Sequence, residues 1–334
     1  MTEEELGLHL LEIEITNKCN LNCLHCYVDR TKPMFMQPQE VYKLIDFAIK
    51  HKITRLIFTG GEPLLCPDLF QYANYARDKG INSLFLMTNG LLLNEANIQK
   101  CKVFDEIQLS LDELPNSKAS IRNDYLKILE KKFELLRKNN ILFLLFVTLN
   151  KLNYELIPDF VQYARSQDAY ISFNCLVPLY PELHKLTLNQ KQLYQVLKEI
   201  NTFSKSNNHV SFNNHFKVLV DPEEHEVLEQ YPKNQIVGGC LAGIASAYIT
   251  VKGDVYACPF LKIPAGNVFK NPLDDIWLNS NLLNSLRKRH KFKKPCGNCT
   301  FLSMCGGCRA LSYIKTGDYL GADSMCIKGE IYEN

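Results

Sequence analysis

The chain has 334 residues, of which 46% are hydrophobic and 22% are charged, and its formal net charge is +2. This composition provides enough apolar side chains for a packed core, so it excludes disordered and fibrous proteins. The near balance of 38 basic and 36 acidic residues gives no electrostatic basis for nucleic-acid binding. No apolar run approaches the roughly 18 residues of a membrane span, so we expect neither a membrane nor a nucleic-acid partner.

The first 180 residues predict alternating strands and helices. Short apolar runs that end at polar or glycine residues predict strands at 8–15, 55–59, 83–87, 106–110, 141–148 and 169–175. Apolar residues at helical spacing predict helices between them at 38–50, 67–79, 94–100, 125–138 and 155–166. Parallel strands need crossover helices to cover them. Six such units are too few for a closed eightfold barrel, so we expect an α/β fold with a partial (β/α)6 barrel of TIM type.

The pattern changes after residue 180. A polar helix is expected at 189–205, a hairpin joins 247–251 to 255–257, and an amphipathic helix is expected at 272–289. We therefore divide the chain into three parts. They are the barrel at 1–180, a helical or irregular connector at 181–237, and a small cysteine-rich domain at 238–334.

Several polar or small residues follow the predicted strands, where parallel α/β folds place their chemistry. They are Cys19, Gly60, Thr88, Ser110 and Asn150. Glycine and asparagine also end strands for reasons of turn geometry alone. Such residues nevertheless lie at or just after the ends of five predicted strands, which favours a shared site at this edge of the sheet.

The 13 cysteines are the most informative residues. An odd number in a chain without a signal peptide favours a reducing compartment, so we expect a cytoplasmic protein. Three cysteines lie within residues 19–26, and seven more lie after residue 238. Cys66, Cys101 and Cys175 stand apart and are expected to be structural, with Cys175 a weaker candidate for a supplementary ligand.

Cys19, Cys23 and Cys26 form a C-x3-C-x2-C motif directly after the first strand. Three thiolates on one tight loop can hold three corners of a four-iron cluster, which leaves the fourth iron open to another ligand. Zinc is the alternative, although it usually has a fourth protein ligand nearby, and His25 inside the motif is poorly placed to be one.

This motif resembles the signature of the radical SAM superfamily, in which His25 occupies the aromatic position near the adenine of S-adenosylmethionine (SAM). The second strand ends in Gly60-Gly61-Glu62-Pro63, which resembles the family's GGEP motif. Two glycines let a ligand approach the backbone, and the Glu62 carboxylate suits the methionine ammonium group.

The resemblance implies further SAM-binding residues, listed from the better to the looser matches: Ser110, Asn150 and the backbone near Val177. Thr88 is expected to face the substrate. A turn or strand-end hydrogen bond is an equal alternative for Ser110, Asn150 and Thr88. The family's activity would be reductive cleavage of SAM to a 5′-deoxyadenosyl radical, which takes hydrogen from a substrate. It implies one SAM-binding 4Fe-4S cluster and a reducing partner of flavodoxin or ferredoxin type.

The C-terminal cysteines resemble a SPASM domain, which carries auxiliary iron–sulfur clusters. The run Cys296-x2-Cys299-x5-Cys305-x2-Cys308 is shorter than the family pattern by one residue in its last spacing. The resemblance implies one cluster on Cys296, Cys299, Cys305 and Cys326. A second cluster on Cys240, Cys258 and Cys308 would lack one thiolate, so one or two auxiliary clusters are expected. A zinc ribbon is the alternative.

The expected enzyme is therefore a radical SAM oxidoreductase or peptide maturase that modifies a ribosomally made precursor peptide. Because the chain begins at the first barrel strand, we expect a separate protein to bind the leader peptide. The alternative is a small-molecule enzyme, such as a tetrapyrrole-pathway step, because residues 317–321 resemble those relatives. A zinc-stabilised scaffold without activity is the third hypothesis. No side chain is assigned as a general base.

Overall fold

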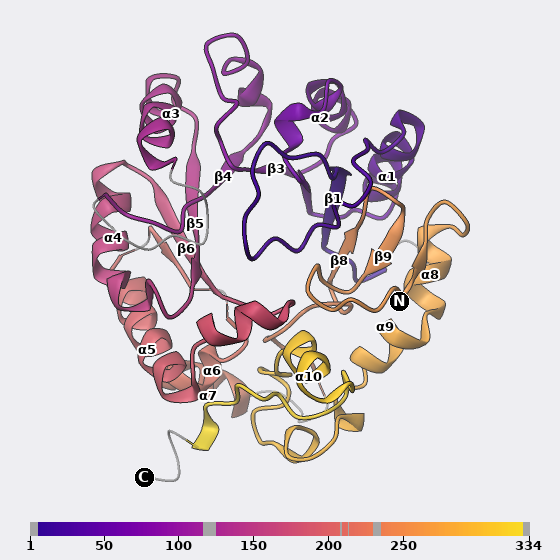
Figure 1. Cartoon of the computed structure of the whole chain (residues 1–334). Helices are drawn as coiled ribbons and strands as arrows, with labels where there is room; N and C mark the ends of the chain where they lie inside the picture. The colour runs from indigo at the N-terminus through magenta and orange to yellow at the C-terminus, as the bar shows by residue number, and fades with distance from the viewer. Residues whose placement is uncertain (1–5, 116–124, 208, 213, 230–234, 330–334) are drawn as a thin grey trace.

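The structure, a computed structural model, describes residues 6–115, 125–207, 209–212, 214–229 and 235–329. Its centre is a ten-stranded sheet in the order β10-β9-β8-β1-β2-β3-β4-β5-β6-β7. The six strands of the barrel run parallel to one another and form an arc (Figure 1). They are β1 (Leu10–Thr16), β2 (Arg55–Gly60), β3 (Ser83–Thr88), β4 (Glu106–Ser110), β5 (Phe143–Leu149) and β6 (Tyr170–Cys175). The predicted partial barrel is confirmed.

Helices cover the outside of the arc (Figure 1): α1 (Pro38–Lys50), α2 (Leu69–Asp78), α3 (Leu126–Lys138), α4 (Ile157–Ser166) and α5 (Gln190–Ser206). In β1 the period of two sends Leu11, Ile13 and Ile15 into the core, where each is fully buried. Glu12 and Glu14 alternate with them and therefore lie on the opposite face, inside the arc. The barrel thus has an apolar outer layer and a polar interior.

Two predicted helices are wrong. Residues 95–99 form turns, followed by a 3₁₀ helix at Lys100–Val103. The side chains of Asn94 and Asn97 bond to backbone groups there, which competes with a helix. The predicted helix at 272–289 is divided into α8 (Leu273–Asn279) and α9 (Asn281–Leu286), because Ser280 has an extended backbone with ψ 124°. Asparagine and serine at this point favour helix ends over helix interiors.

The C-terminal part joins the barrel directly. β8 (Ser246–Ile249) pairs in parallel with β1, and β9 (Asp254–Tyr256) and β10 (Gly266–Asn267) continue the sheet antiparallel. At the other edge, β7 (Val210–Ser211) pairs with β6. The division of the chain at 180 and 238 stays a prediction, because one sheet runs through all three parts.

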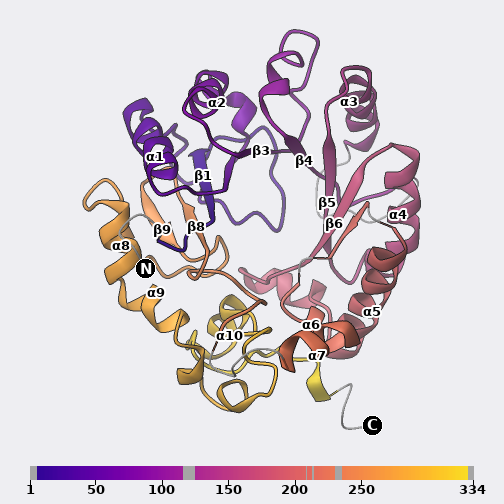
Figure 2. The same cartoon turned by 180° about the vertical axis from the view of Figure 1, so that it is seen from behind.

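The final cysteine-rich segment closes the gap in the arc. Figures 1 and 2 show α10 (Arg309–Thr316) between α9 on one side and α6 (Lys217–Val220) and α7 (Pro222–Glu229) on the other. In the described ranges, none of the helices is both long and apolar enough to span a bilayer.

Candidate functional site

The loop that follows β1 carries the first cysteine motif and lies within the arc of strands (Figure 1). Asn17 fixes its shape, because its side-chain amide donates to the carbonyls of Asp29 (2.7 Å) and Lys32 (3.0 Å) and accepts from the Met34 amide (2.7 Å). Thr16 donates to the Met34 carbonyl at 2.8 Å. Both ends of the loop are thus tied together, and the segment with the cysteines is held over the strand ends.

A cavity of about 120 Å³ lies between this loop and the carboxyl ends of the strands. Its lining includes most of the residues singled out in the sequence: Cys19, Cys23, His25, Cys26, Gly60, Gly61, Thr88, Ser110 and Val177. The cysteine loop and the ends of four strands, β2, β3, β4 and β6, contribute these groups. The topology of a parallel barrel brings them together although up to about 158 residues separate them in sequence.

Gly60 and Gly61 allow the closest approach of backbones in this cavity. A Cβ atom on Gly60 would lie 2.0 Å from the Thr16 carbonyl oxygen, and one on Gly61 would lie 2.2 Å from that of Lys18. The Gly61 amide donates to the Thr16 carbonyl at 2.7 Å. The glycines are therefore required to dock β2 against the cysteine loop, in addition to any contact with a ligand.

Glu62 does not line the cavity. Its side chain is fully buried, and its carboxylate accepts from Thr88 Oγ1 (2.6 Å), the Asn89 amide (2.9 Å) and the Leu64 amide (3.0 Å). Burial raises the pKa of this carboxyl group, and the three donors oppose that shift. In this arrangement Glu62 joins the end of β2 to the end of β3, and its contact with an ammonium group stays a prediction.

His25 faces a buried carboxylate from the fourth strand end. Its Nε2 lies 3.6 Å from Asp112 Oδ2, and both side chains are largely buried. Asp112 also accepts from the Thr148 amide at 2.6 Å, so it is fixed relative to β5. Asp112 lies two residues after Ser110, at the end of the same strand. This position could have identified it from the sequence as a further residue of the site.

Asn150, the looser of the predicted ligands, is not part of the cavity lining. Its amide donates to the Thr148 carbonyl (3.1 Å) and accepts from the Leu152 amide (2.9 Å), which is the turn role that the sequence left open. Thr148 and Asn174 line the cavity instead. The two residues are paired across β5 and β6, so they lie side by side on the same face of the sheet.

A second cavity, of about 770 Å³, is formed by the cysteine-rich segment. Cys296, Cys299, Cys305 and Cys326 all line it. These four thiols surround a volume and not a point, which suits a cluster better than a single ion. Across the described residues, no three His, Cys, Asp or Glu side chains converge on one metal ion.

Cys308 belongs to a different group from its neighbours in the motif. Burial, followed by the Asp323 carboxylate and the thiols of Cys240 and Cys258, raises its pKa well above the ordinary value. Burial and the nearby Cys240 thiol likewise raise the pKa of Cys258 to about 12. The chain thus places Cys240, Cys258 and Cys308 near one another, so ligand binding at these thiols must displace protons.

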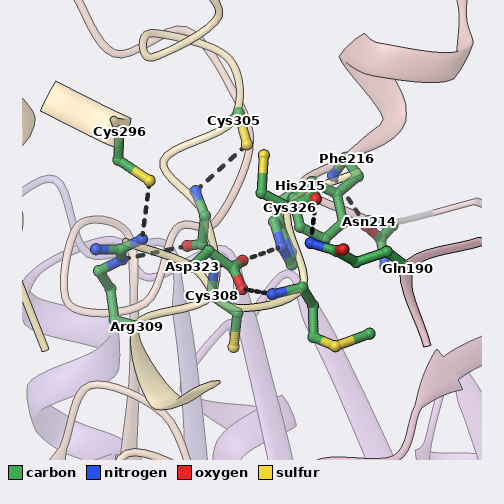
Figure 3. A network of polar contacts seen from close by, with 12 residues as sticks. Gln190, Asn214, His215, Phe216, Cys296, Cys305, Cys308, Arg309, Asp323 and Cys326 are labelled. Carbon is green, nitrogen blue, oxygen red and sulfur yellow. Dashed lines mark hydrogen bonds and ion pairs between the residues drawn. The ribbon is translucent and has the colours of Figure 1, made fainter. Parts of the chain in front are cut away.

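Figure 3 shows Asp323, Arg309 and His215 beside Cys296, Cys305, Cys308 and Cys326. Asp323 accepts from the Cys308 amide at 2.6 Å and contacts His215 Nε2 at 3.3 Å. Arg309, which is 4% exposed, points its Nη2 at Cys296 Sγ at 3.9 Å. A guanidinium group beside a thiol stabilises the thiolate, so the donor set and its surroundings fit an anionic iron–sulfur cluster.

A third cavity, of about 750 Å³, lies on the other side of the cysteine loop, against β8 and β9. Cys23, Cys26 and Tyr27 of the loop line it together with Tyr248 and Tyr256. Its ionisable lining residues are four acidic and three basic: Glu14, Asp29, Glu182 and Asp254, with Arg30, Lys252 and Lys262. Cys23, Cys26, Tyr27, Val28 and Arg30 line this cavity as well as the smaller one, so the cysteine loop borders both.

Comparisons with known proteins agree with both cysteine motifs. The family model of the radical SAM superfamily matches residues 13–164, and that of an iron–sulfur cluster-binding domain, SPASM, matches residues 240–300. The chain is 29% identical to the AdoMet-dependent heme synthase of Methanosarcina barkeri, over 95% of this chain and 96% of that protein. It is 25% identical to the mycofactocin maturase MftC of Mycobacterium ulcerans, over 95% and 87% of the two chains.

Solved structures show the same fold. The SuiB protein of Streptococcus suis, in a crystal structure with bound S-adenosylmethionine, superposes with a TM-score of 0.77 over 96% of this chain and 77% of that one. Its sequence identity to this chain is 19%, so this likeness is evidence of the fold alone. The two family matches include Cys19–Cys26 and Cys240–Cys299, and the relatives named above are enzymes. The chain therefore carries a radical SAM domain in residues 13–164 and an iron–sulfur cluster-binding SPASM domain in residues 240–300, and it is an enzyme.

Proposed function

We propose that the cavity of about 120 Å³ is the SAM site, with a four-iron cluster held by Cys19, Cys23 and Cys26. The observation that carries this proposal is the convergence of the three thiols, two glycines and several strand-end polar groups on one cavity. When bound, the cluster supplies the electron that cleaves SAM into methionine and a 5′-deoxyadenosyl radical, which takes hydrogen from the substrate.

The protein's own groups would orient SAM in the following way. The backbone of Gly60 and Gly61, which no Cβ atom shields, is available to the methionine end. Ser110 and Thr148 offer hydroxyl groups on neighbouring strands, and His25, held by Asp112, offers a ring face to the adenine. Asn150 would affect SAM binding indirectly, because it stabilises the turn that follows β5.

Glu62 and Thr88 are proposed as positioning residues. Their mutual hydrogen bond of 2.6 Å keeps the GGEP loop against β3. A buried carboxylate with three donors is costly to disturb, because any donor left without its partner would lose a charge-assisted bond. Thr88 also lines the cavity, so it can contact the substrate, as its position at the strand end predicts.

The C-terminal thiols are proposed to hold one or two auxiliary clusters. Cys296, Cys299, Cys305 and Cys326 would hold one of them, at the 770 Å³ cavity. Cys240, Cys258 and Cys308 supply three ligands for the other, so its fourth position would be taken by a group other than cysteine. These clusters would accept the electron that remains when the substrate radical is oxidised.

The substrate that we propose is a ribosomally made precursor peptide, bound in the 750 Å³ cavity. The observation in its favour is the lining, which is rich in tyrosine and carries charges of both signs. Such a surface suits a peptide with mixed side chains and a polar backbone. A reducing protein of ferredoxin or flavodoxin type and a leader-binding protein are its proposed partners.

The second candidate substrate is a tetrapyrrole. It is favoured by the 29% identity to a protein named AdoMet-dependent heme synthase over nearly the whole of both chains. Its weakness is electrostatic, because a macrocycle with several carboxylates would meet four acidic and three basic side chains in the cavity.

Anaerobic reconstitution followed by mass spectrometry tests both proposals. Dithionite and SAM should release 5′-deoxyadenosine from the reconstituted protein, and iron-free protein should release none. Candidate precursor peptides and an iron porphyrin with propionate groups are then supplied in parallel. A peptide that loses hydrogen supports the first substrate, and a porphyrin that changes mass while the peptides stay intact overturns it.

A further inference from the structure

A run of basic residues immediately precedes the cysteines of the auxiliary site. Residues 287–294 read Arg-Lys-Arg-His-Lys-Phe-Lys-Lys, with six arginine or lysine side chains, one histidine and no acidic residue. The whole chain has a net charge of only +2, so this run is a strong local concentration of positive charge. Sequence alone does not separate a structural role from a docking role for such a run.

The structure divides this run into two sets. Arg287 and Arg289 point inward, and each donates to backbone carbonyls: Arg287 to Gly243 and Trp277, Arg289 to carbonyls of two cysteine loops. Their charges hold the chain together and do not face solvent. The arginines therefore explain only part of the run.

The lysines point outward. Lys288, Lys291, Lys293 and Lys294 are all exposed, as is His290. Lys293 forms an ion pair with the Asp318 carboxylate at 2.5 Å. We call Lys288, Lys291, Lys293 and Lys294 the lysine patch.

The lysine patch adjoins the mouth of the 770 Å³ cavity. Lys294 lines this cavity together with Lys328, and the thiols of Cys296 and Cys299 line it as well. Phe301, which is half-buried, contributes an apolar surface at the same place. A redox site thus opens to the surface beside a cationic rim.

We propose that the lysine patch is the docking surface for an acidic one-electron carrier protein of ferredoxin type, which exchanges electrons with the auxiliary site of Cys296, Cys299, Cys305 and Cys326. Opposite charge steers such carriers to their partners, and their complexes are small, transient and dependent on ionic strength. In each transfer the auxiliary site gives up the one electron that it received from the substrate radical, and the oxidised carrier gains that electron and becomes reduced, without a proton.

This proposal rests on the iron–sulfur assignment and not on the identity of the substrate. Its test is titration of the reconstituted holoenzyme with an acidic bacterial ferredoxin, at low and at high salt. The test variant is Lys288→Glu/Lys291→Glu, which reverses two charges of the patch away from the cysteines. The matched control is Lys127→Glu/Lys131→Glu, two exposed lysines on α3 with the same change in net charge.

We expect the patch variant to raise the ferredoxin Kd about tenfold at low salt, with a smaller effect at high salt, and the control to leave the Kd unchanged. SAM cleavage driven by dithionite, which needs no carrier, should be equal in all three proteins. Loss of that reaction in the patch variant would indicate damage to the metal sites. In that case Lys288→Gln/Lys291→Gln is measured instead, with about a threefold weaker binding expected.

An unchanged Kd in the patch variant, or an equal loss in the control, overturns the proposal. So does wild-type protein that binds an acidic peptide through the patch and does not bind the ferredoxin. The first two outcomes leave the proposed SAM chemistry intact, because the dithionite reaction reports on it separately.

Discussion

Arg289 connects the two cysteine loops, and its removal gives a quantitative test of how the auxiliary region is held together. The side chain is 4% exposed, and its guanidinium group donates four hydrogen bonds to backbone carbonyls. The acceptors are Leu302 (3.0 Å) and Ser303 (2.8 Å) on one loop, and Gly238 (2.8 Å) and Cys240 (2.7 Å) on the other. Cys240 and Cys305 therefore depend on the same side chain for their relative position.

The expected effect of Arg289→Met follows from these contacts. A hydrogen bond to a charged group contributes about 1.5–3 kcal/mol, so four at the lower end give about 6 kcal/mol. Water that enters the space can satisfy part of the exposed carbonyl groups. We therefore expect the free energy of unfolding to fall by about 3–5 kcal/mol, which is at the upper end for single substitutions.

Two measurements check this expectation under anaerobic conditions: denaturant unfolding of the reconstituted protein, and iron content per chain. The variant should retain the iron of the SAM site and lose iron from the auxiliary sites. Arg55→Met is the control, because this arginine is exposed and lies over the Phe85 ring, and it should change stability by less than about 0.5 kcal/mol. Wild-type stability together with full iron content in Arg289→Met would refute the reasoning.

Three further predictions concern the individual sites. Cys23→Ala should abolish SAM cleavage, whereas Cys299→Ala should cleave SAM without forming product, and full product from Cys299→Ala in a mass-spectrometric assay would contradict an essential auxiliary site. Burial raises the pKa of Glu14 from 4.5 to about 7. Between these two pH values the folded state keeps a proton that the unfolded state has lost. The free energy of unfolding should therefore fall by about 3 kcal/mol as the pH rises from 4.5 to 7. Glu14→Gln should lose less stability than wild type between pH 5 and pH 8 in denaturant unfolding, and identical losses would argue against this pKa. Gly61→Ala would place a Cβ atom 2.2 Å from the Lys18 carbonyl oxygen and so displace the cysteine loop. Calorimetry should detect at least a tenfold loss of SAM affinity. Normal affinity would show that the cysteine loop moves away without disturbing the SAM site.

Much of the barrel could be predicted because its signals are local. Each strand is a short apolar run, and the expected strands at 55–59, 83–87 and 106–110 lie within one residue of β2, β3 and β4. The cysteine motif and Gly60-Gly61 identified the family before any geometry was known. In both cases the information lies within a few consecutive residues.

The remainder depends on contacts between distant residues. Asn94 and Asn97 favour turns over the expected helix through side-chain bonds that helical periodicity does not reveal. The register between β5 and β6 pairs Thr148 with Asn174, and both line the cavity, whereas Asn150 lies in the turn after β5. The burial of Glu62 likewise follows only from the packing of β2 against β3.

The second cysteine set shows the same distinction. The spacing of the motif made a metal site a strong prediction, but Cys308 lies three residues after Cys305 and nevertheless groups with Cys240 and Cys258. The buried charges around these thiols, such as Asp323, carry no recognisable sequence signal. They become visible only when α10 has been placed against the loop of Cys240.

The central claim is that SAM binds directly to the cluster held by Cys19, Cys23 and Cys26. Electron paramagnetic resonance of the dithionite-reduced protein, before and after addition of SAM, tests it most directly. A protein in which the auxiliary cysteines are replaced by alanine leaves this cluster as the sole source of signal. We predict that SAM shifts the g values of that signal, whereas a spectrum that is identical with and without saturating SAM would contradict the account.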